Sequence, residues 1–268
     1  MSEAFRAFSP RGIPGKNLFC DHLHPNPIGY RIMANEFRRA ISKTDLLRPL
    51  DQKNKYITTP LMVTGLDWEI GSIRIFKLKH SWPFEIKTVN YAAYPPYENE
   101  VSAQIAKNFL FDHHSWGRAH SEMADHYVKS GALNKACAEY RVIVEMFPGK
   151  IEYYIKLIDC AKTINAWQIV ESTCLKALNI SNSKGVFYYN LALSERMTGK
   201  IEKALKSIQK AIDAPELSRE QLTHFFYTYA TFLLDARQLS AAKQLLQELI
   251  KKAPDFRPAK ELLRQLPN

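Results

Sequence analysis

The chain has 268 residues, of which 46% are hydrophobic and 24% are charged, a composition typical of a globular protein. No apolar run approaches the roughly 18 residues that a membrane-spanning helix needs. The net charge of +10 is spread along the chain and forms no basic stripe, so we expect no nucleic-acid binding. The four cysteines lack the spacing of a zinc or redox motif, so we expect no metal and no cofactor.

The first predicted element is a polar loop followed by a helix over about 27–41. The loop contains Asp21 and His24 in the spacing Asp-x-x-His, with a proline directly after the histidine. Apolar residues recur at helical spacing after the loop and are expected to form one face of the helix: Ile28, Ile32, Met33, Phe37 and Ile41.

This block, with Pro25 and Gly29, resembles the last motif of the SGNH (GDSL-type) hydrolases. The resemblance implies that residues 1–43 are a short C-terminal remnant of an α/β hydrolase domain, with His24 as general base and Asp21 as the residue that orients it. The chain has no Gly-Asp-Ser motif, and a βαβ unit of about 30 residues does not fit before Asp21. We therefore expect an incomplete triad, in a piece of a longer hydrolase or a truncated product.

Two other interpretations of the loop stay open. Cys20, His22 and His24 are all competent metal ligands, although no second group of ligands follows nearby in the sequence. In the other interpretation the loop is an ordinary polar connection. If Met1 is the native start, we expect a cytoplasmic protein, whereas an upstream start would leave room for an export signal.

Residues 44–116 are predicted to be a helical connector. Thr64 and Asp67 have the spacing of a capping box that opens a helix to about Lys79. Three features are expected after it: a helix stop at Trp82-Pro-Phe84, an extended linker over Tyr91–Asn99 and a helix over about Glu100–Phe111. This mixture resembles the connector of SGNH hydrolases that carry C-terminal repeats.

From residue 117 onward the chain is repetitive. Small or β-branched residues recur at Ala136, Val170, Ala204 and Ala242, with spacings of 34, 34 and 38 residues. Apolar residues at helical spacing surround each of these positions, which predicts pairs of helices with apolar faces.

Glycine and proline divide the repeats into helical hairpins. Gly131 and Gly199 are expected to end the first helix of a pair, because glycine adopts the required turn at little cost. Pro148, Pro215 and Pro254 are expected to stop the second helix from continuing.

The pattern resembles the tetratricopeptide repeat (TPR), whose period is about 34. The resemblance implies a mainly α fold, an α-solenoid of about four hairpins over residues 117–268 with a capping helix at Arg257–Gln265. It also implies a module that binds other proteins and carries no chemistry of its own.

The expected function is therefore non-catalytic binding of a protein or peptide in the concave groove of the repeats. The alternative is enzymatic: a fragment of an ester hydrolase that contributes Asp21 and His24 to a Ser-His-Asp triad. A groove without a specific partner also stays open, as does the oligomeric state. The phase of the helices places five candidate partner-binding residues in the groove: Lys156, Tyr189, Asn190, Arg196 and Tyr227.

Overall fold

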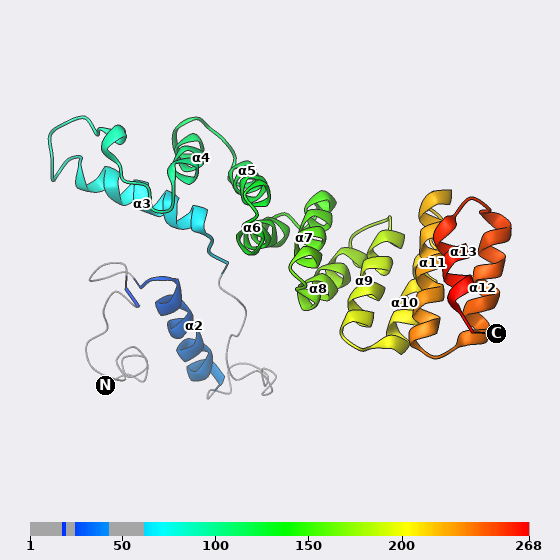
Figure 1. Ribbon diagram of the computed structural model, residues 1–268. Coiled ribbons are helices and arrows are strands. Elements are labelled where there is room, and N and C mark those ends of the chain that lie inside the picture. Colours follow the sequence, from blue (N-terminus) through cyan, green and yellow to red (C-terminus); the bar gives the residue numbers. More distant parts are fainter. Residues whose placement is uncertain (1–17, 20–24, 43–61, 268) are drawn as a thin grey trace. The chain divides into compact units, whose positions relative to one another are not determined.

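The computed structural model describes residues 18–19, 25–42 and 62–267 (Figure 1). The chain divides into two compact units, Met1–Val63 and Thr64–Asn268. The described residues are mainly helical, with one isolated β-bridge between Phe19 and Pro25. None of the described helices is long and apolar enough to cross a membrane.

In the first unit, α2 (Pro27–Ser42) is the predicted amphipathic helix. It begins after Asn26, whose side-chain oxygen accepts hydrogen bonds from the N–H groups of Ile28 and Gly29 at 3.0 Å each. Gly29 has no room for a side chain, because a Cβ there would lie 2.3 Å from the carbonyl oxygen of Leu18. Four large hydrophobic residues of α2 are exposed: Ile28, Tyr30, Phe37 and Ile41.

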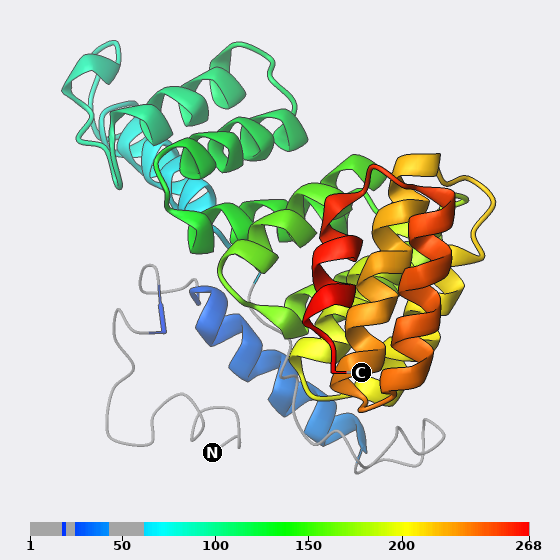
Figure 2. The same cartoon turned by 45° about the vertical axis from the view of Figure 1, so that its right-hand side comes forward.

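The second unit is a row of helix pairs closed by a last helix. The pairs are α3 (Gly65–Lys79) with α4 (Glu100–Phe111), α5 (Trp116–Lys129) with α6 (Leu133–Met146), α7 (Ile151–Thr163) with α8 (Trp167–Leu178), α9 (Gly185–Met197) with α10 (Ile201–Ile212), and α11 (Arg219–Asp235) with α12 (Leu239–Lys252). The predicted capping helix is confirmed as α13 (Arg257–Gln265), which packs against α12 (Figure 2).

The predicted repeat is confirmed by burial. The four anchor residues Ala136, Val170, Ala204 and Ala242 all have no exposed surface. Each lies on the second helix of its pair, at α6, α8, α10 and α12. Short side chains at these positions let neighbouring helices approach closely, which is why the spacing of the anchors follows the spacing of the pairs.

A left-handed residue joins the two helices of each of these four pairs. Gly131, Asn165, Gly199 and Arg237 have φ values of 76°, 55°, 76° and 59°. In every case the next residue donates its N–H to the carbonyl oxygen five positions earlier, at 2.7–2.8 Å. This is the Schellman type of helix ending. The turns at the two glycines were predicted from the sequence. Asn165 and Arg237 form the same turn, which was not predicted because neither residue is a glycine.

The border predicted at residue 116 does not coincide with a border between the compact units. Leu66 and Ile73 of α3 and Ala106 of α4 are buried in the same core cluster as Met123 of α5. The compact unit therefore begins at Thr64, where the predicted capping box with Asp67 is present. Local sequence signals did not show this packing, because it joins residues up to 57 positions apart, such as Leu66 and Met123.

The segment between α3 and α4 is not an extended linker over its whole length. Tyr91–Ala93 forms one turn of 3-10 helix, and Asn90 caps it by accepting a hydrogen bond from the N–H of Ala92 at 3.1 Å. The side chain of Tyr94 is buried against Phe76 in an edge-to-face contact, with ring centroids 5.3 Å apart. Tertiary packing thus overrides the proline and tyrosine content that predicted a linker.

We predict that Gly131→Ala lowers the free energy of unfolding by about 1 kcal/mol, because alanine must then adopt a left-handed conformation. A Cβ at this position meets nothing within 4 Å, so no clash contributes. Gly149→Ala is the matched control, since its surroundings are equally open and its φ is not positive. Urea unfolding followed by circular dichroism measures both, and an equal loss in the control would contradict the explanation.

Candidate functional site

The first helices of the pairs, α5, α7, α9 and α11, share one face, which we call the first-helix face. It corresponds to the face predicted to be concave. Polar side-chain pairs cross from one first helix to the next along it, among them Lys156 with Asp125, Lys162 with Asn190, and Arg196 with Asp235, at 3.0, 3.0 and 2.5 Å. These contacts make the surface between the helices polar.

A cavity of about 260 Å³ lies on this face between α7, α9 and α11, and we call it the first-helix cavity. Its walls combine aliphatic, aromatic and polar side chains, a mixture typical of binding sites. The lining residues are Ile155, Ile158, Asp159, Lys162, Val186, Phe187, Tyr189, Asn190, Gln221 and Phe225.

The aromatic wall of the cavity is a stack of Tyr189 on Phe225. The two rings are nearly parallel, with centroids 4.2 Å apart and planes inclined by 6°. The Tyr189 hydroxyl lies 3.0 Å from Nε2 of His224 and 3.4 Å from Oγ1 of Thr228. Burial raises the pKa of Tyr189, so this hydroxyl stays protonated at neutral pH. The stack is therefore held at both its ring face and its polar end.

The polar wall of the cavity is formed by Lys162 and Asn190. Lys162 Nζ donates to Asn190 Oδ1 at 3.0 Å and lies 3.5 Å from Asp159 Oδ1. The Asn190 Nδ2 group donates to the carbonyl oxygen of Val186 at 2.8 Å, which fixes the orientation of the buried amide. A lysine ammonium has three donors, so it can serve a further acceptor in the cavity.

The other predicted partner-binding residues lie outside the lining. Lys156 pairs with Asp125, and Arg196 pairs with Asp235 and stands over the ring of Phe232 at 5.3 Å. Tyr227 packs edge-on against Phe256, with ring centroids 5.5 Å apart, in the cluster next to α13. The structure therefore brings Tyr189 and Asn190 together in one cavity and places Tyr227 elsewhere on α11.

Sequence reasoning did not select several residues of the cavity. Phe225 stands two positions before the selected Tyr227, and Ile155 and Lys162 are seven residues apart and therefore share one face of α7. A signal existed for Ile155, which is apolar at a helix position that the repeat pattern leaves exposed. No comparable signal existed for the pairing of Lys162 with Asn190, because it depends on how α7 and α9 are stacked.

Asp21 and His24, the two residues of the predicted incomplete triad, lie outside the described residues. Their proposed roles as orienting acid and general base stay predictions from the sequence. The helix expected to follow them is present as α2.

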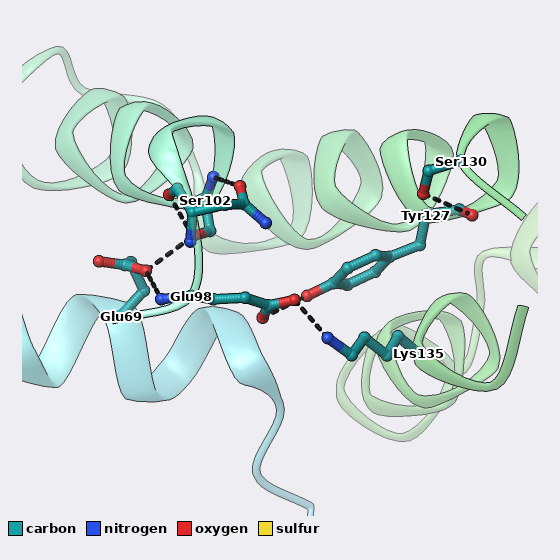
Figure 3. A network of polar contacts seen from close by, with 7 residues as sticks. Glu69, Glu98, Ser102, Tyr127, Ser130 and Lys135 are labelled. Carbon is teal, nitrogen blue, oxygen red and sulfur yellow. Dashed lines mark hydrogen bonds and ion pairs between the residues drawn. The ribbon is translucent and has the colours of Figure 1, made fainter. Parts of the chain in front are cut away.

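At the start of the row, the carboxylate of Glu69 on α3 accepts hydrogen bonds from the segment that precedes α4 and from α4 itself (Figure 3). This side chain is fully buried. Its Oε1 accepts from the Tyr94 hydroxyl at 2.7 Å and the Tyr97 N–H at 2.9 Å. Its Oε2 accepts from the Glu98 N–H at 3.0 Å and the Ser102 hydroxyl at 2.6 Å. One carboxylate thus satisfies four donors from the linker and α4.

The network continues to the next helix pair through Glu98. Its Oε2 accepts from the Tyr127 hydroxyl of α5 at 2.6 Å, and its Oε1 lies 2.5 Å from Nζ of Lys135 on α6 (Figure 3). Burial raises the pKa of Glu69, but the hydrogen bonds from Ser102 and its other donors outweigh burial and lower the pKa below its usual value. The network therefore depends on an ionised Glu69.

A second buried polar group joins α3, α5 and α6 at His120. Its Nδ1 lies 2.5 Å from Oε2 of Glu139, its Nε2 lies 3.4 Å from Oδ1 of Asp67, and the Trp116 ring covers it at 3.8 Å. Burial lowers the pKa of His120, but its contacts with the carboxyl groups of Asp67 and Glu139 outweigh burial and raise it. The two carboxylates therefore favour the imidazolium form.

The geometry of the four pairs from α5 to α12 is that of tetratricopeptide hairpins: paired helices, a buried small or β-branched residue at a spacing near 34, and one Schellman turn in each of these four pairs. The second unit is a TPR-like helical solenoid. No known protein family and no curated protein matches the chain.

Among solved structures, a crystal structure of MamA is 17% identical with a TM-score of 0.47, covering 52% of this chain and 80% of its own. The structure of YrrB, described as a TPR protein with an unusual peptide-binding site, is 16% identical with a TM-score of 0.44, covering 57% of this chain and 75% of its own. The assignment of the TPR-like solenoid rests on its own hairpin geometry. The predicted hydrolase remnant gains no support from these comparisons.

We predict that Glu69→Gln lowers the free energy of unfolding by about 3 kcal/mol, because the amide turns one acceptor into a donor that faces buried donors. Glu248→Gln is the matched control, since this glutamate is exposed on α12 and should change stability by less than about 0.5 kcal/mol. Urea unfolding of the two variants measures the difference. Similar losses in both variants would show that the hydrogen-bond network of Glu69 does not contribute to the free energy of unfolding.

The same substitution has a predicted pH dependence. A carboxyl whose pKa is lowered on folding stabilises the protein above its unfolded pKa, near 4.5, and this contribution is lost as the pH falls through the folded pKa. The stability difference between the parent and Glu69→Gln should therefore be constant near neutral pH and shrink below pH 4.5. Unfolding curves measured from neutral to acidic pH test this, and a difference that grows on acidification would contradict it.

Proposed function

We propose that the TPR-like solenoid is a non-catalytic protein-interaction module that binds an extended segment of another protein on the first-helix face. The observation that carries the proposal is the first-helix cavity, which is lined by an aromatic stack, an exposed isoleucine and a lysine–asparagine pair. An apolar pocket with a few fixed polar groups is the usual form of a recognition site.

The two walls suit two parts of a peptide. An aliphatic or aromatic side chain of the partner would pack between Ile155 and the Tyr189–Phe225 stack, where it gains apolar contact area. A peptide carbonyl oxygen beside that side chain would accept a hydrogen bond from Lys162. Asn190 is already fixed by Val186, so its role is to position the ammonium group.

Of the five residues predicted to bind the partner, we propose Tyr189 and Asn190 as part of the cavity and Lys156 and Arg196 as its charged neighbours. Each of these two cations is already paired with an aspartate, so an acidic partner would have to compete with that aspartate. Tyr227 is not included, because its ring is occupied by Phe256. No observation in the described residues favours the enzymatic alternative with Asp21 and His24.

The test is selection of short random peptides displayed on phage against the full chain, followed by binding measurements on the selected peptide. We expect Ile155→Arg to weaken its binding at least about tenfold, because a charge then enters the apolar wall. Leu175→Arg is the matched control: Leu175 is 50% exposed on α8, against 42% for Ile155, and lies outside the cavity lining.

Fluorescence polarisation gives the affinities, and circular dichroism checks that both variants stay folded. Tyr189→Ala should weaken binding as well, since it removes half of the aromatic stack. If the control weakens binding as much as Ile155→Arg, or if neither does, the peptide binds elsewhere and the groove proposal is wrong.

A further inference from the structure

The turn that follows α3 presents large apolar side chains to solvent. Trp82, Phe84 and Ile86 are 80%, 69% and 97% exposed, the highest values among the large hydrophobic residues that the structure describes. The turn is closed within itself, because the N–H groups of Phe84 and Glu85 both donate to the carbonyl oxygen of Ser81, at 2.9 and 3.0 Å. The exposed side chains therefore belong to a turn that is held by its own backbone hydrogen bonds.

The apolar surface continues along one side of α3. Trp68, Ile75 and Leu78 are exposed at the spacing of a single helical stripe. Leu66, Ile70 and Ile73 form a separate stripe that is buried in the core. Helix α3 is thus apolar on two sides, of which the core covers one. Contiguous exposed apolar surface of this kind marks an interaction site more often than scattered single residues do.

Positive charge surrounds this apolar surface. Arg74, Lys77, Lys79 and Lys87 are all exposed, and Glu85 is the one acidic residue in residues 74–87. We call residues 74–87, with their apolar and basic side chains, the α3 tip. Figure 1 shows the tip at the end of the row opposite α11, α12 and α13.

We propose that the α3 tip binds the surface of an anionic lipid bilayer. Tryptophan and phenylalanine with flanking lysines are the composition of peripheral membrane sites, where rings enter the headgroup region and cations attract anionic lipids. The tip is a protruding turn, and the cavities described on the solenoid are lined by other residues. A projecting apolar turn suits a deformable lipid surface better than a protein, whose interface would offer a matching concave or flat shape.

The test uses the full chain and two kinds of vesicle, phosphatidylcholine alone and an equimolar mixture of phosphatidylcholine and phosphatidylserine. We expect sedimentation with the mixed vesicles, weaker binding at high salt, and little binding to phosphatidylcholine. Tryptophan emission should shift to shorter wavelength on binding. Trp82→Phe should bind with at most a severalfold loss and lack most of that shift, which identifies Trp82 as the side chain that enters the bilayer.

Two comparisons of tip variants with control variants distinguish binding through the tip from nonspecific hydrophobic binding and from attraction by the net charge. Trp82→Ser with Phe84→Ser should weaken partitioning at least about tenfold, whereas Met146→Ser with Leu175→Ser, exposed elsewhere, should not. Replacing three tip lysines by glutamine should weaken partitioning at least about tenfold, unlike three such changes elsewhere. The tip set is Lys77, Lys79 and Lys87, and the control set is Lys150, Lys206 and Lys251.

Circular dichroism of all variants confirms that they are folded. Equal losses in the tip and control sets would mean that net charge alone attracts the vesicles, and the proposal would be wrong. Absence of binding to both kinds of vesicle would overturn it as well. Because the tip lies outside the first-helix cavity, neither outcome bears on peptide binding there.

Discussion

The solenoid depends on close contact between helix pairs at one small or branched buried residue in each pair. A single pair leaves one of its apolar sides uncovered, and the next pair covers it. Ala136, Val170, Ala204 and Ala242 allow this contact because their side chains are short and fully buried. The position of every first helix, and therefore the shape of the first-helix face, follows from this repeated contact.

The first pair is held differently. Helix α3 shares the apolar core, but the carboxylate of Glu69 also binds four donors from the linker and α4, and Glu98 carries the network on to α5 and α6. Such a network tolerates little displacement, since each lost partner leaves a buried polar group unsatisfied. The network holds α3 in place, so the exposed turn after α3 projects from an ordered part of the solenoid.

The two proposed surfaces differ in chemistry. The first-helix cavity is concave, and its lysine and arginine neighbours are paired with aspartates, which suits a peptide more than a charged surface. The α3 tip projects, and its cations stand beside the most exposed apolar side chains of the described chain. A module with both surfaces would hold a protein partner close to a membrane surface.

The sequence by itself determined the repeated part of the fold. The anchor spacing, the glycine turns, the capping box at Thr64 and Asp67 and the last helix are local signals, and local hydrogen bonding and packing produce what they predict. Tertiary structure alone decided three things: that α3 and α4 join the solenoid core, that Arg237 takes a left-handed turn, and that Tyr189 stacks on Phe225 while Tyr227 meets Phe256. Each depends on contacts between residues far apart in the chain or on strain imposed by the neighbouring helices, and neither leaves a local pattern in the sequence.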